Sequence, residues 1–482
     1  MSEPTKSQRE TLEKSIPFSS YIGVGLGAII GIGWLMYSGQ WLLEGGPAGA
    51  MLAFFICGLL LIPIGESYAE LTSSIPVAGG ELAFAYKAFG PLPAFLTAWA
   101  VALSYTAITP FETIAIGALF EAMAPSMISD QLYQIGGYRI GLSTIIPGLL
   151  SGIFLIWLNI RGVASSTRVQ LWIVSALAAC SAVFIVTALF KGDVAHLTPM
   201  FANGGSWAAA PASIISVLVV APYFMAGFDT IPQAAEESGV NMKPRQLGVA
   251  ILACIVLGAL FYVLIILAVA MSVSQEQLQT LMKQNDVLPT AEVFRVAFHY
   301  EWAARLVMVA ALLGLISTLN GFYIASSRLL FSLGRGGLLP HWFAKVHDKH
   351  QTPSNAVLFV GAISLLGPFI GKSALIPIVN SGALTFAVTL LMTCLAAVRL
   401  RFRHPEMPRP FRANTLSLYA GIAVSALLVL LMTVPQSPGF LKPLEFLIIG
   451  GWMAFGLAGY IARRAMGDIS REERDQLILG DY

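Results

Sequence analysis

The sequence predicts an all-α integral membrane protein. Of its 482 residues, 56% are hydrophobic and 11% are charged, whereas soluble domains carry about 25% charged residues. The apolar residues gather in runs of roughly 18 to 28 residues, the length that a helix needs to cross the hydrocarbon core. A soluble fold is therefore excluded.

Twelve membrane spans follow from these runs, and Lys and Arg orient them. The spans are expected near residues 18–43, 47–72, 91–120, 141–160, 166–190, 212–236, 246–272, 303–332, 355–371, 374–398, 416–434 and 444–463. With the N-terminus inside, the cytoplasmic segments hold 21 of the 28 Lys and Arg residues. By the positive-inside rule, both termini are predicted to be cytoplasmic.

Two spans are interrupted near their middles by glycine or proline. Residues 28–34 (AIIGIGW) interrupt span 1, and residues 221–229 (APYFMAGFD) interrupt span 6. Unpaired backbone groups inside a bilayer cost several kcal/mol unless something binds them. Such breaks in corresponding places indicate the substrate site of a secondary transporter.

The spacing of the two breaks predicts an internal repeat. Five spans are an odd number, so a second unit of five begins on the opposite face of the membrane. We expect the first five-span repeat over residues 18–190 and the second over 212–400, with an external loop at 191–211 between them. A basic loop and spans 11 and 12 follow over 401–464. Cytoplasmic tails are expected at both ends, over 1–17 and 465–482. Spans 11 and 12 are expected to serve lipid packing or a homodimer contact.

The glycines of span 1 have two interpretations. Gly23, Gly27 and Gly31 follow the small-xxx-small pattern of packed helices. That pattern does not account for Gly33, two residues beyond Gly31. Together with the break in span 6, this pair favours a binding site.

Six motifs, in order along residues 18–413, resemble the amino acid–polyamine–organocation (APC) superfamily of transporters, in particular its amino acid permease and cationic amino acid transporter branch. They are Gly27–Gly33 (GAIIGIG), 227–229 (GFD) with 234–237 (AAEE), 159–162 (NIRG), 317–321 (STLNG) with 326–328 (SSR), 333–337 (LGRGG) and 405–412 (PEMPRPFR).

This resemblance implies a LeuT-like fold of two inverted five-helix repeats plus two extra C-terminal helices, working by alternating access. Backbone at Ile30, Gly31 and Gly33 would take a substrate carboxylate. Backbone around Tyr223, Met225 and Ala226 would take its amine, and the Tyr223 ring would close over it. The implied substrate-binding set is Ile30, Gly31, Ile32, Gly33, Trp34, Glu112, Tyr223, Phe224, Met225, Ala226 and Gly227. Ile32 and Trp34 are larger than the usual residues there, which implies a smaller or reshaped pocket.

Glu112 lies in span 3, roughly 12 Å from its outer end. Placing a charged carboxylate at that depth in the membrane costs about 2.5 kcal/mol or more of insertion free energy. It is either a protonated group hydrogen-bonded between helices, or a partner for a substrate ammonium group or a proton.

Three carboxylates lie toward the cytoplasmic end of span 6: Asp229, Glu236 and Glu237. One interpretation is helix capping and ion pairing with Arg161 or Arg328. The other is an inner gate, in which Tyr223 also takes part.

The coupling ion stays open. Relatives that couple to protons often carry a lysine in span 5, and residues 171–190 contain none. Ser317 and Thr318 could bind sodium with carbonyls of span 1, although such hydroxyls commonly bond their own helix backbone. Proton symport through Glu112 and exchange without an ion are the alternatives.

Other features indicate neither cofactor, metal nor nucleic acid. The cysteines at 57, 180, 254 and 394 fall inside spans without metal spacing, and the histidines at 341, 347 and 350 share one loop beside lysines. The basic run 399–412 directly follows a span, so anionic lipid explains it better than nucleic acid does.

The sequence therefore predicts a secondary transporter of amino acids or related small amines, and not an enzyme. A polyamine or ethanolamine-type transporter is the alternative. An intramembrane enzyme fits less well because no HExxH or GxSxG motif is present, and a channel fits less well because the helix breaks suit a binding site occluded from both sides. Short tails and loops favour the bacterial inner membrane over a eukaryotic plasma membrane.

Overall fold

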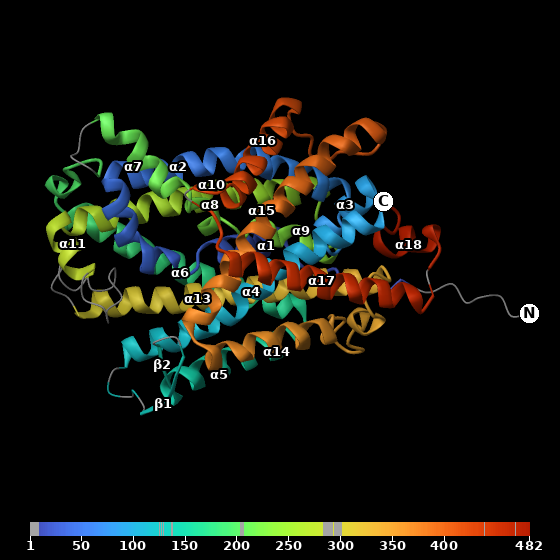
Figure 1. Ribbon diagram of the computed structural model, residues 1–482, viewed down its shortest axis with the longest axis horizontal. Coiled ribbons are helices and arrows are strands. Elements are labelled where there is room, and N and C mark those ends of the chain that lie inside the picture. Colours follow the sequence, from blue (N-terminus) through green and yellow to red (C-terminus); the bar gives the residue numbers. More distant parts are fainter. Residues whose placement is uncertain are drawn as a thin grey trace, which may run out of the picture.

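The structure is a computed structural model that describes residues 9–124, 126, 128, 130–135, 138–202, 207–282, 293, 301–437, 439–467 and 469–482. Residues 1–8 of the predicted N-terminal tail and 203–206 of the predicted external loop lie outside the described residues. Helices form nearly all of the described chain, as Figure 1 shows. A hairpin of β1 (Gln131–Ile135) and β2 (Tyr138–Gly141) lies between two of them.

The α-helices follow one another along the chain with short connections. They are α1 (Phe18–Ile29), α2 (Gly33–Ser74), α3 (Glu81–Phe89), α4 (Pro91–Met123), α5 (Leu142–Ile160), α6 (Val163–Lys191), α7 (Ala210–Leu218), α8 (Ala221–Phe224), α9 (Thr230–Gln233), α10 (Pro244–Ser272), α11 (Gln275–Met282), α13 (Glu301–Arg335), α14 (Ser354–Ile370), α15 (Lys372–Arg403), α16 (Thr415–Thr433), α17 (Pro443–Ala465) and α18 (Arg471–Ile478).

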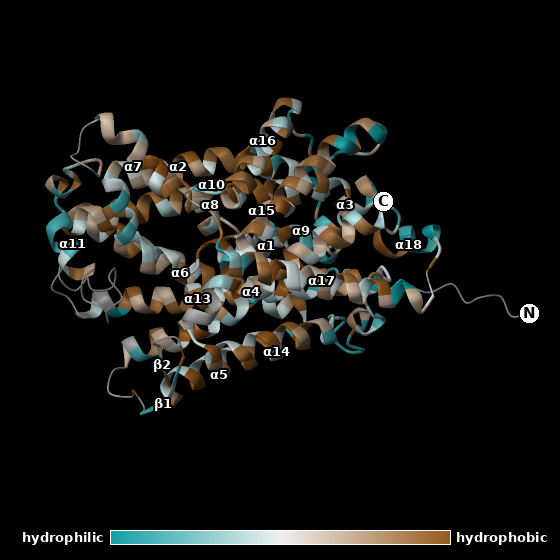
Figure 2. Ribbon diagram, viewed as in Figure 1, coloured by the Kyte–Doolittle hydropathy of each residue, from teal (hydrophilic) through white to brown (hydrophobic). Residues whose placement is uncertain are grey.

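Hydropathy confirms the all-α membrane architecture. Within the described residues, 9 helices are long and apolar enough to cross a membrane, and three shorter apolar helices cover Phe18–Ile29, Trp207–Leu218 and Ser354–Ile370. Apolar residues dominate the long helices in Figure 2. Because α2 runs through Gly46 (φ 70°) and joins two predicted spans, the count of twelve spans stays a prediction, as do the boundaries of the two repeat units.

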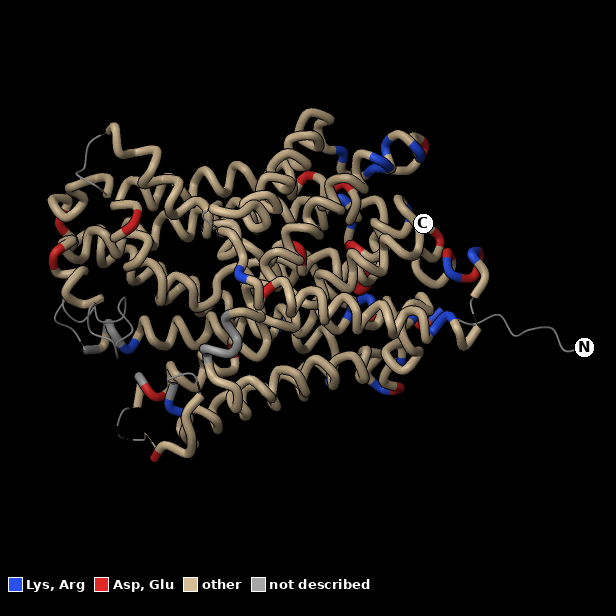
Figure 3. The backbone as a smooth tube through the Cα atoms, in the orientation of Figure 1, with Lys and Arg blue, Asp and Glu red and all other residues tan. Residues whose placement is uncertain are grey.

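Both ends of the chain lie at the same end of the helix bundle (Figure 1). Most Lys and Arg residues gather at that end as well, as Figure 3 shows. This arrangement agrees with the predicted orientation, in which the termini and the basic loops share one side of the membrane. We call this end the inner end.

The interrupted helices pass through the centre of the bundle. α1 packs against α6, α10 and α13, and α2 packs against α7 and α10. α4 packs against α13, α14 and α15 on another side. The breaks in the two interrupted helices are thus enclosed by long, continuous helices, which hold the surrounding frame in place.

The C-terminal helices are attached to this frame. α16 packs on α2 and α15, while α17 packs on α4 and α15. Trp99 of α4 and Trp452 of α17 stack with ring centroids 4.7 Å apart. Each indole N–H donates to the backbone carbonyl of the other tryptophan, at 2.8 Å in both cases. The homodimer contact predicted for these helices stays a prediction.

Candidate functional site

The first helix break lies between α1 and α2. α1 ends at Ile29, and Ile30 leaves the helical conformation with φ −92° and ψ 75°. The freed carbonyls of α1 find side-chain donors: the Tyr262 hydroxyl donates to Ile29 O at 3.1 Å, and the Thr318 hydroxyl donates to Gly27 O at 3.1 Å. The helix restarts at Gly33; the amides of Leu35 and Met36 donate to Ile32 O at 2.9 and 3.2 Å, whereas those of Gly33 and Trp34 precede the first intrahelical hydrogen bond. This end of α2 favours negative charge.

The second break lies opposite the first. α8 ends at Phe224 and α9 begins at Thr230. Gly227 between them has φ 137°, a conformation that favours glycine. A Cβ atom on Gly227 would lie 2.7 Å from Ile29 N, and one on Gly33 would lie 2.5 Å from the Phe224 ring. The two breaks are therefore in direct contact.

A cavity of about 620 Å³ lies beside these breaks. Seven residues of the predicted substrate-binding set line it: Gly31, Ile32, Gly33, Glu112, Tyr223, Phe224 and Ala226. They come from α2, α4, α8 and the two breaks. The cavity thus brings together residues that lie up to two hundred positions apart in the sequence.

The other four predicted residues lie behind the cavity wall. The Trp34 ring is fully buried and meets Phe261 edge to face at 6.2 Å. Met225 is also fully buried, and its methyl group lies near Gly258 of α10. Ile30 and Gly227 support the break from behind, through their contacts with Gly314 and Ile29. Of the two unusually large residues, only Ile32 lines the cavity.

Glu112 presents a carboxyl group to the cavity. Its side chain is 5% exposed, and its Oε2 atom has no hydrogen-bond partner within the described structure. By contrast, both oxygens of the buried Glu237 carboxylate accept hydrogen bonds from Arg328. One interpretation of Glu112 is a carboxyl group hydrogen-bonded to a neighbouring helix. Within the described structure, its Oε2 atom makes no such hydrogen bond. An unpaired buried oxygen that lines a cavity is suited to receive a donor from a ligand.

Aromatic side chains that the sequence did not single out form part of the wall. Trp41 of α2 contacts Phe224 with ring centroids 4.9 Å apart and Tyr262 at 5.9 Å. Tyr37 contacts Phe224 at 5.2 Å. These rings supply apolar surface that suits a hydrocarbon side chain, and a cation can also lie over their faces.

The outer wall of the cavity includes a second carboxylate, Glu445 of α17. It is 3% exposed. The Asn380 amide donates to its Oε1 at 3.1 Å, whereas Oε2 has no partner within the described structure. Exposed Lys442 and Glu44 line the mouth nearby. Sequence analysis did not single out this residue, because Glu445 stands at the predicted start of span 12, where a charged side chain is ordinary.

Two of the three carboxylates predicted toward the end of span 6, Asp229 and Glu237, are hydrogen-bonded to buried side chains. The Tyr105 hydroxyl donates to Asp229 Oδ2 at 2.5 Å. Arg328 donates to both oxygens of Glu237, at 2.8 and 3.0 Å. All of these side chains are fully buried.

Glu236 joins the N-terminal segment to α13. It accepts two hydrogen bonds from Arg335, at 2.7 and 2.8 Å, and one from Arg9 at 3.1 Å. The predicted ion pairing is therefore present for Glu236 and Glu237. Of the two arginines expected to supply it, Arg328 does so, whereas Arg161 lies over the Trp157 ring instead, 4.7 Å from its centroid.

The region considered for sodium holds a neutral amide. Gln170 of α6 donates from Nε2 to Ser317 O at 3.0 Å and to Ser317 Oγ at 2.9 Å, and its Oε1 accepts from Asn320 at 2.9 Å. Gln170 therefore uses the Ser317 oxygens that a cation would need. No cluster of three or more His, Cys, Asp or Glu residues suited to a metal occurs among the described residues.

Comparison with known proteins identifies the family. Residues 16–455 match the family model for amino acid permeases. The chain belongs to the amino acid permease family. This permease is 25% identical to the branched-chain amino acid permease of Bacillus subtilis (strain 168), with 94% of each chain covered. It is 26% identical to the methylthioribose transporter of the same organism, again with 94% of each chain covered.

A plant relative is similar over a shorter range. Cationic amino acid transporter 7, chloroplastic, of Arabidopsis thaliana is 27% identical over 78% of the permease and 64% of its own length. All three relatives are named as permeases or transporters. The permease is accordingly a multi-pass membrane transporter, not an enzyme, and the predicted APC resemblance is confirmed.

Proposed function

We propose that this permease moves amino acids or related small amines across the membrane by alternating access. The observation that carries the proposal is the cavity at the two helix breaks, which is lined both by the N-terminal end of α2 and by Glu112. A helix N-terminus favours a carboxylate, and a carboxylate side chain favours an ammonium group. An amino acid carries both groups.

The two ends of the site differ in a way that supports alternating access. Exposed residues line the mouth of the cavity, among them Gln40, Glu44 and Lys442. The opposite end is closed by the buried pairs of Asp229 and Glu237 described above. This asymmetry fits a state that is open outward and closed inward. Tyr223, which lines the cavity, is the residue we propose to close over the substrate.

Two modes of coupling are compatible with the site. In proton symport, Glu112 would bind the proton, since it is a titratable group that lines the cavity. In exchange, one substrate would leave as another enters and no ion would be needed. The use of Ser317 by Gln170 supports these modes over sodium coupling.

A polyamine or ethanolamine-type amine is the second candidate cargo. Two buried carboxylates, Glu112 and Glu445, line the same cavity. Such a pair favours a substrate with two ammonium groups or with no carboxylate of its own. The names of the relatives, which cover branched-chain and cationic amino acids and methylthioribose, leave both candidates open.

Uptake into proteoliposomes tests the proposal. Purified permease would be offered labelled amino acids, polyamines and ethanolamine-like amines, with and without an inward proton gradient, and with an empty or a preloaded lumen. We expect saturable uptake of one class. Stimulation by the gradient would indicate symport, and uptake only after preloading would indicate exchange. Absence of uptake under every condition would contradict the proposed cargo.

A matched pair of glycine variants ties the uptake to the site. Gly33→Leu should abolish transport, because its side chain would enter the Phe224 ring. Gly450→Leu, on α17, is the control, because nothing lies within 4 Å of the position of its Cβ. Equal uptake by both variants would contradict a site at the helix breaks.

A further inference from the structure

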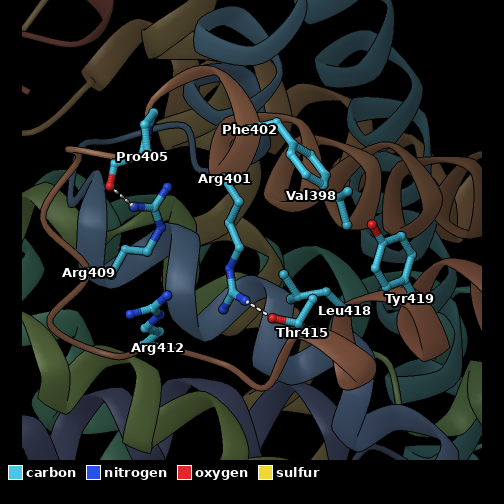
Figure 4. A pocket seen from close by; sticks show the side chains of 9 residues that line it. All are labelled: Val398, Arg401, Phe402, Pro405, Arg409, Arg412, Thr415, Leu418 and Tyr419. Atoms are coloured by element: carbon cyan, nitrogen blue, oxygen red, sulfur yellow. Dashed lines mark hydrogen bonds between the residues drawn. The ribbon is translucent and has the colours of Figure 1, made fainter.

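A second pocket lies at the inner end of the bundle, away from the substrate cavity. It has a volume of about 210 Å³ and lies between the end of α15 and the start of α16. Figure 4 shows three guanidinium groups, those of Arg401, Arg409 and Arg412, on one side of this pocket. Apolar side chains, including Phe402 and Tyr419, lie on the other.

Two of the three arginines are held rigidly by the fold. Arg401 and Arg409 both donate to the buried Glu70 carboxylate of α2, Arg409 at 3.1 Å and Arg401 at 2.9 Å through its Nε. Arg409 also donates to four backbone carbonyls between residues 400 and 407. Arg401 donates to the Thr415 hydroxyl at 2.8 Å. These contacts fix two positive charges beside the pocket.

The third arginine has its donors available. Arg412 is exposed, and among the described residues it has no hydrogen bond or ion pair. Glu66 adds a second negative charge near Arg401. Glu406 likewise lies near Arg409, so the negative charges are associated with Arg401 and Arg409, and the Arg412 guanidinium is the group with an unused fork of donors. That fork matches the oxygens of a phosphate group.

The apolar side of the pocket faces the surroundings of the bundle. The Phe402 side chain is 74% exposed and Tyr419 is 47% exposed. Both belong to helices that are long and apolar enough to cross a membrane, α15 and α16. The pocket therefore combines an arginine-lined side with an exposed apolar side at the inner end of the bundle.

We infer that this pocket binds an anionic phospholipid of the inner leaflet. Arg412 binds the phosphate, with Arg401 and Arg409 providing the positive field, and the first part of an acyl chain packs on Phe402 and Tyr419. Basic pockets between membrane helices on the cytoplasmic side are suited to acidic headgroups. The inference does not depend on the cargo of the permease.

Binding of phosphatidylglycerol to the purified full-length permease in detergent tests the inference. An acyl-labelled fluorescent phosphatidylglycerol would be titrated, and three competitors would be compared: unlabelled phosphatidylglycerol, phosphatidylcholine with the same acyl chains, and inorganic phosphate. We expect only the first to compete at equal concentration. Arg412→Gln should weaken binding about fivefold, the effect typical of one basic residue at an anionic surface.

Arg403→Gln is the matched control. Arg403, the last residue of α15, is also exposed, and it does not line the pocket. It should leave phosphatidylglycerol binding unchanged. Equal competition by phosphatidylcholine would overturn the inference in favour of general lipid contact, and equal competition by phosphate would overturn it in favour of a soluble anion. Unchanged binding by Arg412→Gln, or equal weakening by Arg403→Gln, would also overturn it.

Discussion

Glu112 could be identified from the sequence because a carboxylate in the middle of an apolar span is rare and costly. The structure adds the two facts that the sequence could not supply. The side chain lines the cavity, and one of its oxygens has no partner within the described residues. Both facts depend on which neighbours pack around α4, and these neighbours come from distant parts of the chain.

At this scale we predict that Glu112→Gln weakens transport of amine or cationic substrates. A charge-assisted hydrogen bond would become a neutral one, a loss of about 1–2 kcal/mol, so KM should rise about tenfold. Initial uptake rates over a range of substrate concentrations and pH values would measure the change.

Glu121→Gln is the control for this prediction. Glu121 stands on the same helix but accepts hydrogen bonds from Ser143 and Thr144 outside the cavity. The amide can still accept from these hydroxyls, so uptake should match that of the unmodified permease. Unchanged KM and unchanged pH dependence in Glu112→Gln would contradict a role in binding.

Other site residues gave no sequence signal. Trp41 and Tyr262 are aromatic residues in apolar helices, and nothing in the sequence separates them from residues that face lipid. Glu445 follows a short loop, where a charged residue is ordinary. Their position on the cavity wall is set by the packing of α2, α10 and α17, which no local pattern encodes.

At the scale of elements, glycine and proline predicted both helix breaks. The extent of each break was less predictable. The second interrupted helix divides into three pieces, α7, α8 and α9, and the first continues beyond its break through Gly46 into the next span. The cause lies in contacts between elements, such as the close approach of Gly227 to Ile29.

Buried polar side chains hold four of these elements together. Asn320 of α13 accepts from Asn159 of α5 at 2.8 Å and donates to Gln170 of α6 at 2.9 Å. Gln170 in turn donates to Ser317 of α13 and, at 3.4 Å, to Gly23 O of α1. A buried network of this kind stabilises the fold when every donor and acceptor in it has a hydrogen-bond partner.

We predict that Gln170→Leu destabilises the permease by about 1–3 kcal/mol. Ser317 would lose the donor it has in Gln170, and the Asn320 Nδ2 group would lose its 2.9 Å acceptor and keep only Ser166 O at 3.4 Å. Thermal unfolding in detergent would show a lower transition temperature. Thr187→Val on the same helix removes only a local bond to Val183 O and should have little effect. Adding Asn320→Leu to Gln170→Leu should cost less than the sum of the single variants. Additive losses would contradict a shared network.

On the scale of the whole molecule, the distribution of Lys and Arg predicted that both termini share one end. It did not predict that the two terminal segments contact each other. Arg9 donates to Leu477 O of α18 at 3.4 Å, and the Tyr86 hydroxyl donates to Asp475 at 2.5 Å. Ser15 and Ile16 donate to Glu237 O. The segments expected to be plain tails therefore cover the inner closure of the site.

We predict that removing residues 470–482 loosens this closure. Without α18, Arg9 loses its contact with Leu477, and the segment of residues 9–17 keeps fewer partners. Amide hydrogen exchange in residues 9–17 should become about tenfold faster, equivalent to about 1.4 kcal/mol of local stability. Exchange in α14, which has no contact with α18 among the element pairs found, serves as the internal reference. Equal exchange in both forms would show that α18 does not support the closure.

The reciprocal bonds between Trp99 and Trp452 set a length scale for the substrate. They join α17, which carries Glu445, to α4, which carries Glu112. We expect this double hydrogen bond to keep the spacing between the two carboxylates constant. In the proposed function, the permease would then select cargoes by the distance between their charged groups.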